Sequence, residues 1–218
     1  MKPICVICGV DEAGKGSVLG PMVIAGVGVR SRDLIEGLGL RDSKQLSPEE
    51  RERLFALIKK MCRTATVIIP AEEIDLIRRD MTMNACVARA HAAVIVRLEP
   101  ETAYVDACDV NPFRYAEMVR NHLTAACEIV SEHHADSTYP VVSAASIVAK
   151  VTRDREIAKL AKKYGKIGSG YPSDPETVAY LVSYIDEHGV PPPIARKSWK
   201  TVSALLAKKS QSSLSSFF

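Results

Sequence analysis

The stretch Gly9-Val10-Asp11-Glu12-Ala13-Gly14-Lys15-Gly16-Ser17 decides how the rest of this sequence is interpreted. It places two adjacent acids and two glycines, Gly14 and Gly16, between two apolar runs, residues 4–10 and 21–29. Short apolar runs rich in valine and bounded by glycine are typical of buried strands. The pattern therefore predicts one strand that ends at the acids, a turn built on the glycines, and a second strand after it.

The two acids are adjacent, and this restricts what they can do together. Successive side chains on a regular strand point to opposite faces, so Asp11 and Glu12 can serve one ion only if the strand ends or bulges between them. Gly14 and Gly16 lack a Cβ, so the backbone can turn sharply there and a ligand can approach its N–H groups. Carboxylate oxygens suit hard cations such as Mg²⁺ or Mn²⁺. The stretch therefore favours a metal site.

Two other interpretations of the stretch stay open. Gly9 to Lys15 fits the P-loop pattern G-x-x-x-x-G-K, but Gly16 follows where that motif needs Ser or Thr to reach Mg²⁺. Carboxylates inside such a loop would also repel nucleotide phosphates. A turn with solvated acids is the second alternative, although burying acids without a partner at the end of an apolar strand is costly. A P-loop-like nucleotide-binding protein remains the alternative from a different class.

Six blocks of the sequence form a recognisable series: DEAGKG (11–16) followed by Gly20-Pro21, DSKQL (42–46), YVD (104–106), AD (135–136), VSAASIVAK (142–150) with Arg153-Asp154, and GSGYPSDP (168–175). Together they resemble the ribonuclease HII family. The blocks occur in the family's order and span nearly the whole chain, and the last block is similar to the archaeal branch. The resemblance implies an α/β fold: a ribonuclease H-like mixed sheet flanked by helices, with a small helical C-terminal subdomain.

The resemblance also implies the site residues. It assigns as catalytic residues, and as ligands of two divalent ions (Mg²⁺ or Mn²⁺), the carboxylates Asp11, Glu12, Asp106 and Asp136. It assigns as substrate-binding residues Gly14, Lys15, Gly16, Lys44, Ser143, Ser146, Lys150 and Tyr171. The family often has Arg where Lys15 stands, and Lys keeps the charge but loses bidentate geometry. The backbone of the glycine turn is therefore expected to matter most, because it would recognise the ribose 2′-OH that distinguishes RNA from DNA.

The residues by themselves support parts of this assignment. Asp106 ends the apolar run 102–106 as Asp11 ends the first strand, and ligands gather at the carboxyl ends of parallel strands. Asp136 precedes a predicted helix over 140–164, whose N-terminus favours a carboxylate. On that helix Ser143, Ser146 and Lys150 fall along one face, at spacings of three and four.

Several His and Cys residues allow other interpretations. The cluster His133-His134-x-Asp136 could by itself be a zinc site. His91, inside a predicted helix over 81–98, is interpreted as a packing residue. Cys5 and Cys8 match C-x-x-C but would face opposite sides of a strand, and no second pair completes a zinc site.

Periodicity and capping signals predict further strands over 64–70 and 127–130. They also predict helices that start at 48, 112, 175 and 198, and the last of these runs through 206.

Charge is distributed unevenly along the chain of 218 residues, whose net charge is +3. Residues 150–218 hold 12 Lys and Arg against 6 Asp and Glu, and the remaining residues hold 17 against 20. A basic part can neutralise phosphates along a duplex while an acidic part holds cations at the scissile bond. No membrane span or signal peptide is recognisable, and the six cysteines suit a reducing compartment, so a cytoplasmic protein is expected.

The last residues change composition abruptly. Gln211, Leu214, Phe217 and Phe218 match the sliding-clamp-binding pattern Q-x-x-aliphatic-x-x-aromatic-aromatic. One helical turn would bring the three apolar side chains together into a plug for a partner's groove. Serine-rich ends are often disordered, but terminal aromatics are unusual in a solvated tail. The pattern therefore predicts that the tail binds a sliding clamp (PCNA).

Three regions are expected: a ribonuclease H-like catalytic core over 1–150, a helical substrate-binding part over 151–209, and the clamp-binding tail over 210–218. The resemblance implies a monomeric endoribonuclease that hydrolyses the RNA strand of RNA–DNA hybrids. It would also incise on the 5′ side of ribonucleotides embedded in duplex DNA, by two-metal-ion catalysis that leaves 3′-hydroxyl and 5′-phosphate ends. A non-catalytic nucleic-acid-binding module is the remaining alternative.

Overall fold

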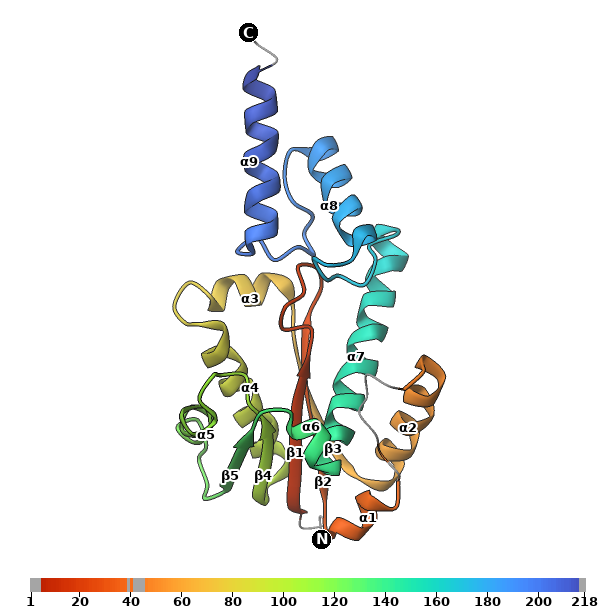
Figure 1. Ribbon diagram of the computed structural model, residues 1–218, viewed down its shortest axis with the longest axis vertical. Helices are drawn as coiled ribbons and strands as arrows, with labels where there is room; N and C mark the ends of the chain where they lie inside the picture. Colours follow the sequence, from red (N-terminus) through yellow and green to blue (C-terminus); the bar gives the residue numbers. More distant parts are fainter. Residues whose placement is uncertain (1–4, 39, 41–45, 216–218) are drawn as a thin grey trace. The chain divides into compact units, whose positions relative to one another are not determined.

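A computed structural model of the chain describes residues 5–38, 40 and 46–215 (Figure 1). With these gaps, the described chain divides into two compact units. We call residues 5–13, 23–68 and 82–152 the sheet unit, and residues 14–22, 69–81 and 153–215 the helical unit. The helical unit therefore contains the turn after Ala13 and a segment before the helix at 83, besides the C-terminal part that the sequence suggested. No described helix is long and apolar enough to cross a membrane.

Among the described residues, five strands form one sheet in the order β3-β2-β1-β4-β5. Their bounds are β1 Cys5–Ala13, β2 Met22–Val29, β3 Arg63–Ile69, β4 Pro100–Asp106 and β5 Glu128–Glu132. β1 pairs antiparallel with β2 and parallel with β4, and β4 pairs parallel with β5. The central strand is thus the one that carries Asp11 and Glu12. The expected mixed sheet flanked by helices is confirmed.

The described helices begin and end as follows: α1 Arg32–Glu36, α2 Pro48–Met61, α3 Ala71–Ile77, α4 Met83–Leu98, α5 Pro112–Arg120, α6 Ala135–Thr138, α7 Pro140–Tyr164, α8 Pro175–His188 and α9 Lys200–Ser215. The start of α2 follows its sequence signals, because Ser47 and Glu50 form a reciprocal capping box and Pro48 occupies the first turn. By contrast, α9 begins two residues later than expected and continues to Ser215 instead of ending at Leu206.

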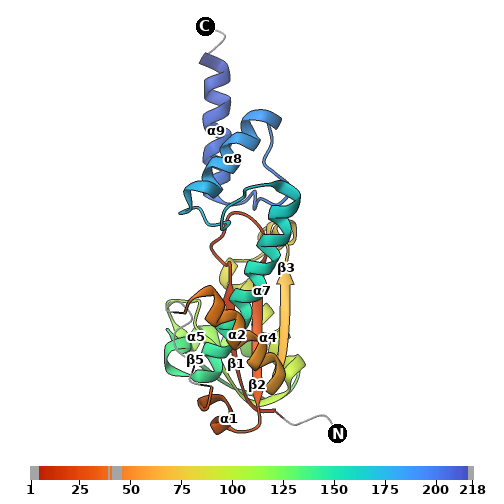
Figure 2. The same cartoon turned by 90° about the vertical axis from the view of Figure 1, so that its right-hand side faces the viewer.

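Helices cover both faces of the sheet within the sheet unit (Figures 1 and 2). α1, α2 and the first part of α7 pack on one face, where α7 lies so close to β1 that a Cβ on Gly9 would be 2.3 Å from the backbone of Val141. α4 packs on the other face, where a Cβ on Gly26 would be 2.3 Å from Val94. Glycines in the central strands therefore let both helices approach the sheet backbone.

The helical unit has its own apolar core. Residues from segments far apart in the sequence pack together there: Val18, Leu19, Ile157, Ile167, Leu181 and Val202. The carboxylate of Asp75 accepts hydrogen bonds from the backbone N–H groups of Lys197 (2.7 Å) and Ser198 (3.0 Å). These contacts tie the α3 segment to the chain just before α9, within one compact unit.

Candidate active site

Two acids lie at the same end of neighbouring parallel strands. Val10 of β1 pairs with Val105 of β4, so Asp11 and Asp106 follow at equivalent positions. The Asp106 carboxylate accepts the backbone N–H of Ala135 at 2.9 Å, which brings the start of α6 to the end of β4. Asp136, the next residue, is buried and close enough for its charge to act on Asp106. The fold thus gathers three of the four expected carboxylates at one edge of the sheet.

Glu12 belongs to the same group although it faces the other side of the sheet. β1 continues to pair with β2 through Ala13, with no bulge between the two acids. Asp11 accordingly hydrogen-bonds Ser146 on α7, whereas Glu12 contacts His91 on α4. The sequence set a condition for the two acids to serve one ion, namely that the strand ends or bulges between them. This condition is not met, because the β1–β2 ladder holds this strand end regular. The charge of Glu12 nevertheless acts on both Asp11 and Asp106.

The electrostatics of this carboxylate centre are unfavourable without a cation. Burial, followed by repulsion from Glu12 and Asp106, raises the pKa of Asp11 well above its ordinary value. Burial also raises the pKa of Asp106, with further repulsion from Glu12 and Asp136, while the N–H of Ala135 opposes the shift. A divalent cation would relieve this repulsion, and an all-oxygen donor set suits Mg²⁺ or Mn²⁺. The residues present therefore fit the hard divalent ions that the sequence suggested.

The side chain of Glu12 is held by residues that sequence reasoning did not assign to the site. His91 is fully buried, and its Nε2 lies 3.2 Å from Glu12 Oε2, while Cys108 Sγ donates to Glu12 Oε1 at 3.1 Å. On its other side, His91 Nδ1 lies 3.2 Å from the hydroxyl of the buried Tyr115. The interpretation of His91 as a packing residue was therefore incomplete. Only a contact map could have joined these four positions, since 12, 91, 108 and 115 form no local motif.

The expected face of α7 is present. Ser143 is buried, Ser146 and Lys150 are partly exposed, and the alanines at 144, 145 and 149 are fully buried against the sheet unit's core. The bond between Ser146 and Asp11 shows that this face meets the carboxylate centre. Ser143 and Lys150 lie on the same helix, at spacings of three and four residues from Ser146.

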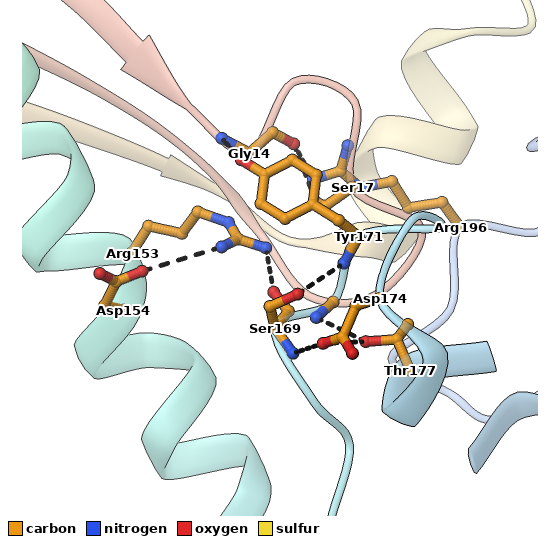
Figure 3. Close-up of polar contacts among 10 residues, drawn as sticks. Gly14, Ser17, Arg153, Asp154, Ser169, Tyr171, Asp174, Thr177 and Arg196 are labelled. Carbon is orange, nitrogen blue, oxygen red and sulfur yellow. Dashed lines mark hydrogen bonds and ion pairs between the residues drawn. The ribbon is translucent and has the colours of Figure 1, made fainter. Parts of the chain in front are cut away.

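The glycine turn belongs to the helical unit, and Figure 3 shows how it is held. Gly14 has a φ of 83°, and its backbone N–H donates to the Tyr171 hydroxyl at 3.1 Å. The ring of Tyr171 stacks on the guanidinium of Arg153, 4.5 Å from the ring centre, and Arg153 donates to the Ser169 carbonyl at 2.8 Å. The expected substrate residues Gly14 and Tyr171 are thus direct partners.

A second arginine, Arg196, holds the turn through its backbone carbonyls. No sequence signal indicated this role. Arg196 is fully buried and donates to the carbonyl oxygens of Gly14 (2.6 Å), Lys15 (2.8 Å) and Gly20 (3.2 Å). With its carbonyls held in this way, the turn leaves Gly16 exposed and Lys15 partly exposed. A Cβ on Gly16 would meet nothing within 4 Å. The accessible part of the turn is therefore its tip.

The P-loop interpretation does not fit this arrangement. Residues up to Ala13 lie in β1, and the chain passes from the turn into strand β2 instead of a helix. A P-loop needs a helix N-terminus directly after the loop to bind phosphates. Of the other sequence expectations, Lys44, Phe217 and Phe218 lie outside the described residues. Gln211 is exposed on α9, and Leu214 belongs to the same helix.

The histidines near Asp136 do not form the zinc cluster that their sequence allowed. His133 Nε2 lies 3.4 Å from the carbonyl of Val110, and His134 adopts a left-handed conformation before α6. Within the described part of the chain, the convergent group with His and Cys donors is Glu12, His91 and Cys108.

Known proteins with similar sequences belong to one family. A family model for Ribonuclease HII matches residues 8–202. The chain is 81% identical to Ribonuclease HII of Methanoregula boonei over 213 residues, which cover 98% of this chain and 100% of the relative. It is 44% identical to Ribonuclease HII of Pyrococcus furiosus over 221 residues, covering 97% of this chain and 98% of the relative.

Solved structures are similar over most of their length. The PCNA:RNase HII complex from Archaeoglobus fulgidus contains a chain of 43% identity with a TM-score of 0.85, covering 89% of this chain and 95% of that one. The ribonuclease H2 of Pyrococcus horikoshii matches at 40% identity with a TM-score of 0.86, covering 93% and 97%. A ribonuclease HIII at 22% identity, with a TM-score of 0.77 over 95% of this chain and 71% of that one, shares the fold.

Proposed function

Because the chain belongs to the ribonuclease HII family, it is a ribonuclease H hydrolase acting on RNA–DNA hybrids, and we propose how it selects and cuts its substrate. It hydrolyses the RNA strand of hybrids and also incises on the 5′ side of single ribonucleotides embedded in duplex DNA. The products carry 3′-hydroxyl and 5′-phosphate ends. The observation that carries this proposal is the gathering of buried, mutually repelling carboxylates at one edge of the sheet.

The residues that would hold two divalent ions, Mg²⁺ or Mn²⁺, are Asp11, Glu12, Asp106 and Asp136. When bound, the ions supply an activated water and stabilise the leaving oxygen of an in-line displacement. The protein's own contribution is to fix the ligands. Ser146 orients Asp11, and the N–H of Ala135 orients Asp106. Such outer contacts fix the orientation of ligands and tune their basicity.

Recognition of the ribose falls to the glycine turn. In this proposal the turn Gly14-Lys15-Gly16 binds the 2′-OH through the backbone N–H groups of Lys15 and Gly16, because the N–H of Gly14 already donates to Tyr171. The 2′-OH is recognised and does not act as the nucleophile. The exposure of Gly16 and the fixed carbonyls of Gly14 and Lys15 support this, because they leave the tip of a rigid turn open to a ligand. Tyr171 packs against the sugar at the junction between ribonucleotide and deoxynucleotide. Contacts to the substrate backbone come from Lys44, Ser143, Ser146 and Lys150.

The test is cleavage of a labelled DNA duplex that contains one ribonucleotide, with Mg²⁺ or Mn²⁺, beside an all-DNA duplex and an RNA–DNA hybrid. Incision on the 5′ side of the ribonucleotide is expected, and it should be lost with chelator and in Asp106→Asn. Asp109→Asn is the matched control. The Asp109 carboxylate accepts hydrogen bonds from the side chain of Asn84 and the backbone N–H of Asn111, and it is not part of the carboxylate centre. If the hybrid is cut but the single-ribonucleotide duplex is not, the proposed specificity is wrong. If Asp106→Asn remains active, the proposed metal site is wrong.

We also propose that the tail binds a sliding clamp through Gln211, Leu214, Phe217 and Phe218. The sequence pattern supports this, as does the similarity to the chain in the PCNA:RNase HII complex of Archaeoglobus fulgidus. Calorimetry with an archaeal PCNA should show binding that weakens at least about thirtyfold in Phe217→Ala/Phe218→Ala, as when aromatic hot spots worth about 2 kcal/mol are removed. The control is Ser212→Ala/Ser213→Ala, at positions that the pattern leaves free. Equal affinity of both double variants for the clamp would contradict the proposal.

We also propose that the enzyme is a monomer and acts in the cytoplasm. All six cysteines are free thiols, which suits a reducing compartment. Analytical ultracentrifugation should give the mass of a single chain, 23.8 kDa. A dimer mass at micromolar concentration would contradict the monomer.

A further inference from the structure

Glu12 belongs to a second group of donors, which we call the soft-donor cluster: Glu12, His91 and Cys108. One carboxylate oxygen, one imidazole nitrogen and one sulfur, drawn from β1, α4 and the chain after β4, all lie within 4.8 Å of one another. The closest approaches are 3.2 Å from His91 Nε2 to Glu12 Oε2 and 3.1 Å from Cys108 Sγ to Glu12 Oε1. The atoms joined by these hydrogen bonds are therefore all of types that commonly bind metal ions.

We propose that the soft-donor cluster is a binding site for Zn²⁺ or a similar transition metal, and that it shares Glu12 with the carboxylate centre. Thiolate and imidazole select zinc and disfavour Mg²⁺, which prefers oxygen ligands. Tetrahedral zinc with ligand bonds of about 2.0–2.3 Å separates its donor atoms by roughly 3.3–3.7 Å. The observed distances of 3.2 and 3.1 Å run to the two different oxygens of Glu12. One oxygen, the nitrogen and the sulfur together lie within 4.8 Å, so the widest pair of donors must move closer when the ion binds. Water would take the fourth position.

The surroundings of His91 match those of a metal-binding histidine. A zinc-ligating imidazole ordinarily has its second nitrogen anchored by a hydrogen bond, which fixes the ring and its tautomer. Here Tyr115 provides that anchor, with its hydroxyl 3.2 Å from His91 Nδ1 and its ring edge-on to the imidazole. When Tyr115 accepts from Nδ1–H, the lone pair of Nε2 points toward Glu12 and the ion.

The cluster is both anchored and accessible. His91 and Tyr115 are fully buried, whereas the side chain of Glu12 is 12% exposed and Cys108 is partly exposed. An ion can therefore reach the carboxylate and the sulfur from solvent while the imidazole stays fixed. On binding, the protons of the Cys108 thiol and of the bond between His91 and Glu12 pass to solvent.

Sharing Glu12 has a consequence that rests on the proposed function. A soft ion that takes both oxygens of Glu12 leaves none to complete a hard-ion site with Asp11 and Asp106. Zn²⁺ at the soft-donor cluster is thus expected to oppose activation by Mg²⁺ or Mn²⁺. Excess Mg²⁺ should relieve the inhibition only partly, because it does not compete for the sulfur and the nitrogen.

Cobalt substitution on the full chain, without substrate, tests the site directly. One Co²⁺ per chain should give a thiolate-to-cobalt charge-transfer band, and one equivalent of Zn²⁺ should remove it. Cys108→Ser should abolish the band and weaken Zn²⁺ binding by roughly 100-fold, and Tyr115→Phe should weaken it about tenfold. Cys127→Ser is the matched control, since Cys127 is also partly exposed but donates to the Glu128 carbonyl instead of Glu12. A band that persists in Cys108→Ser overturns the proposal.

A further variant separates this inference from the proposed nuclease function. Asp136→Asn removes a ligand of the carboxylate centre and leaves the soft-donor cluster intact, so the cobalt band should remain while cleavage is lost. If the band is absent in the unmodified chain although Mg²⁺-dependent cleavage is present, the zinc site is wrong and the nuclease proposal stands. If the band is present but no substrate is cut, the zinc site stands and the nuclease proposal is wrong.

Discussion

The hydroxyl of Tyr171 accepts a hydrogen bond from the backbone N–H of Gly14 at 3.1 Å, across 157 positions of sequence. The same ring stacks on Arg153. One side chain therefore joins the glycine turn to the loop before α8, and its hydrogen bond can be removed while its ring is kept.

Tyr171→Phe keeps the ring on Arg153 and removes the acceptor for Gly14. Losing one hydrogen bond, worth about 1 kcal/mol, should lower single-turnover cleavage of a single-ribonucleotide duplex roughly fivefold. Tyr171→Ala also removes the ring proposed to pack against the sugar. If this packing is worth as much as the stacking of a base on an aromatic ring, about 1–3 kcal/mol, cleavage should fall by a further tenfold or so. Equal rates for Tyr171→Ala and the unmodified enzyme would exclude Tyr171 from the substrate site.

The two glycines of the turn should respond differently to alanine. Gly14 has a positive φ, and a Cβ there would lie 2.5 Å from Arg153 Nε, so Gly14→Ala should lower the melting temperature. Gly16 has open space around it, so Gly16→Ala should melt normally. If the tip of the turn must approach the ribose closely, Gly16→Ala will still cleave at least about tenfold more slowly, because a methyl group keeps the backbone away. Normal cleavage by Gly16→Ala would remove the tip from ribose recognition.

Arg196 should matter for the stability of the glycine turn. It satisfies three backbone carbonyls from a fully buried position, and Lys offers neither the fork nor the reach to replace it. Arg196→Lys should destabilise the chain by about 3 kcal/mol, since buried acceptors are left without donors. Trp199, the single tryptophan, lies 4.9 Å below the guanidinium and can report unfolding in denaturant.

The matched control for Arg196 is Arg155→Lys, an exposed arginine of the same unit. Exposed substitutions of this kind change stability by less than about 0.5 kcal/mol. Similar denaturation midpoints for both variants would show that the contacts of Arg196 do not stabilise the turn.

Asp11→Asn should stabilise the metal-free protein at neutral pH while it abolishes cleavage. The pKa of Asp11 is raised in the folded state, so the folded chain binds more protons than the unfolded chain. This contribution to stability is therefore lost as pH rises from the ordinary aspartate pKa of 3.8 through the raised value. Asparagine removes the buried charge, and thermal melting with chelator at pH 7 measures the gain.

Asp109→Asn should have the opposite effect on the metal-free protein. The N–H of Asn111 and the guanidinium of Arg114 lower the pKa of Asp109, so its charge contributes stability above pH 3.8 that is lost as pH falls through the lowered value. The neutral amide should therefore lower the melting temperature at pH 7. If both variants shift melting in the same direction, the assigned charges of these two carboxylates are wrong.

Local signals in the sequence predicted the features that depend on neighbouring residues. The capping box of α2 and the apolar run of β2 are examples, because a few consecutive side chains determine each of them. The short helices α1, α3 and α6 were not predicted, since five, seven and four residues are too few to show a helical period. The extension of α9 through a serine-rich segment was also missed, because composition there favours a disordered end.

The site shows the same division. The position of Asp106 at a strand end followed from its apolar run and from the family resemblance, and the structure places it beside Asp11. The regular pairing at Glu12 and the contacts of His91 and Arg196 could not be predicted, because they depend on which distant segments become neighbours. A buried histidine looks the same in sequence whether it packs or holds a carboxylate.

The order in which the ribosome makes this chain gives the contacts of the turn a further meaning. Gly14 leaves the ribosome early, but Tyr171 and Arg196, which form hydrogen bonds with it, are made 157 and 182 positions later. Nascent chains fold from the N-terminus in cooperative units as they emerge. A chain that has just completed α6 already possesses all four acids but has a turn without its anchors. Translation must therefore pass residue 196 before the turn can take its shape, and a transcript broken earlier yields acids without a formed turn.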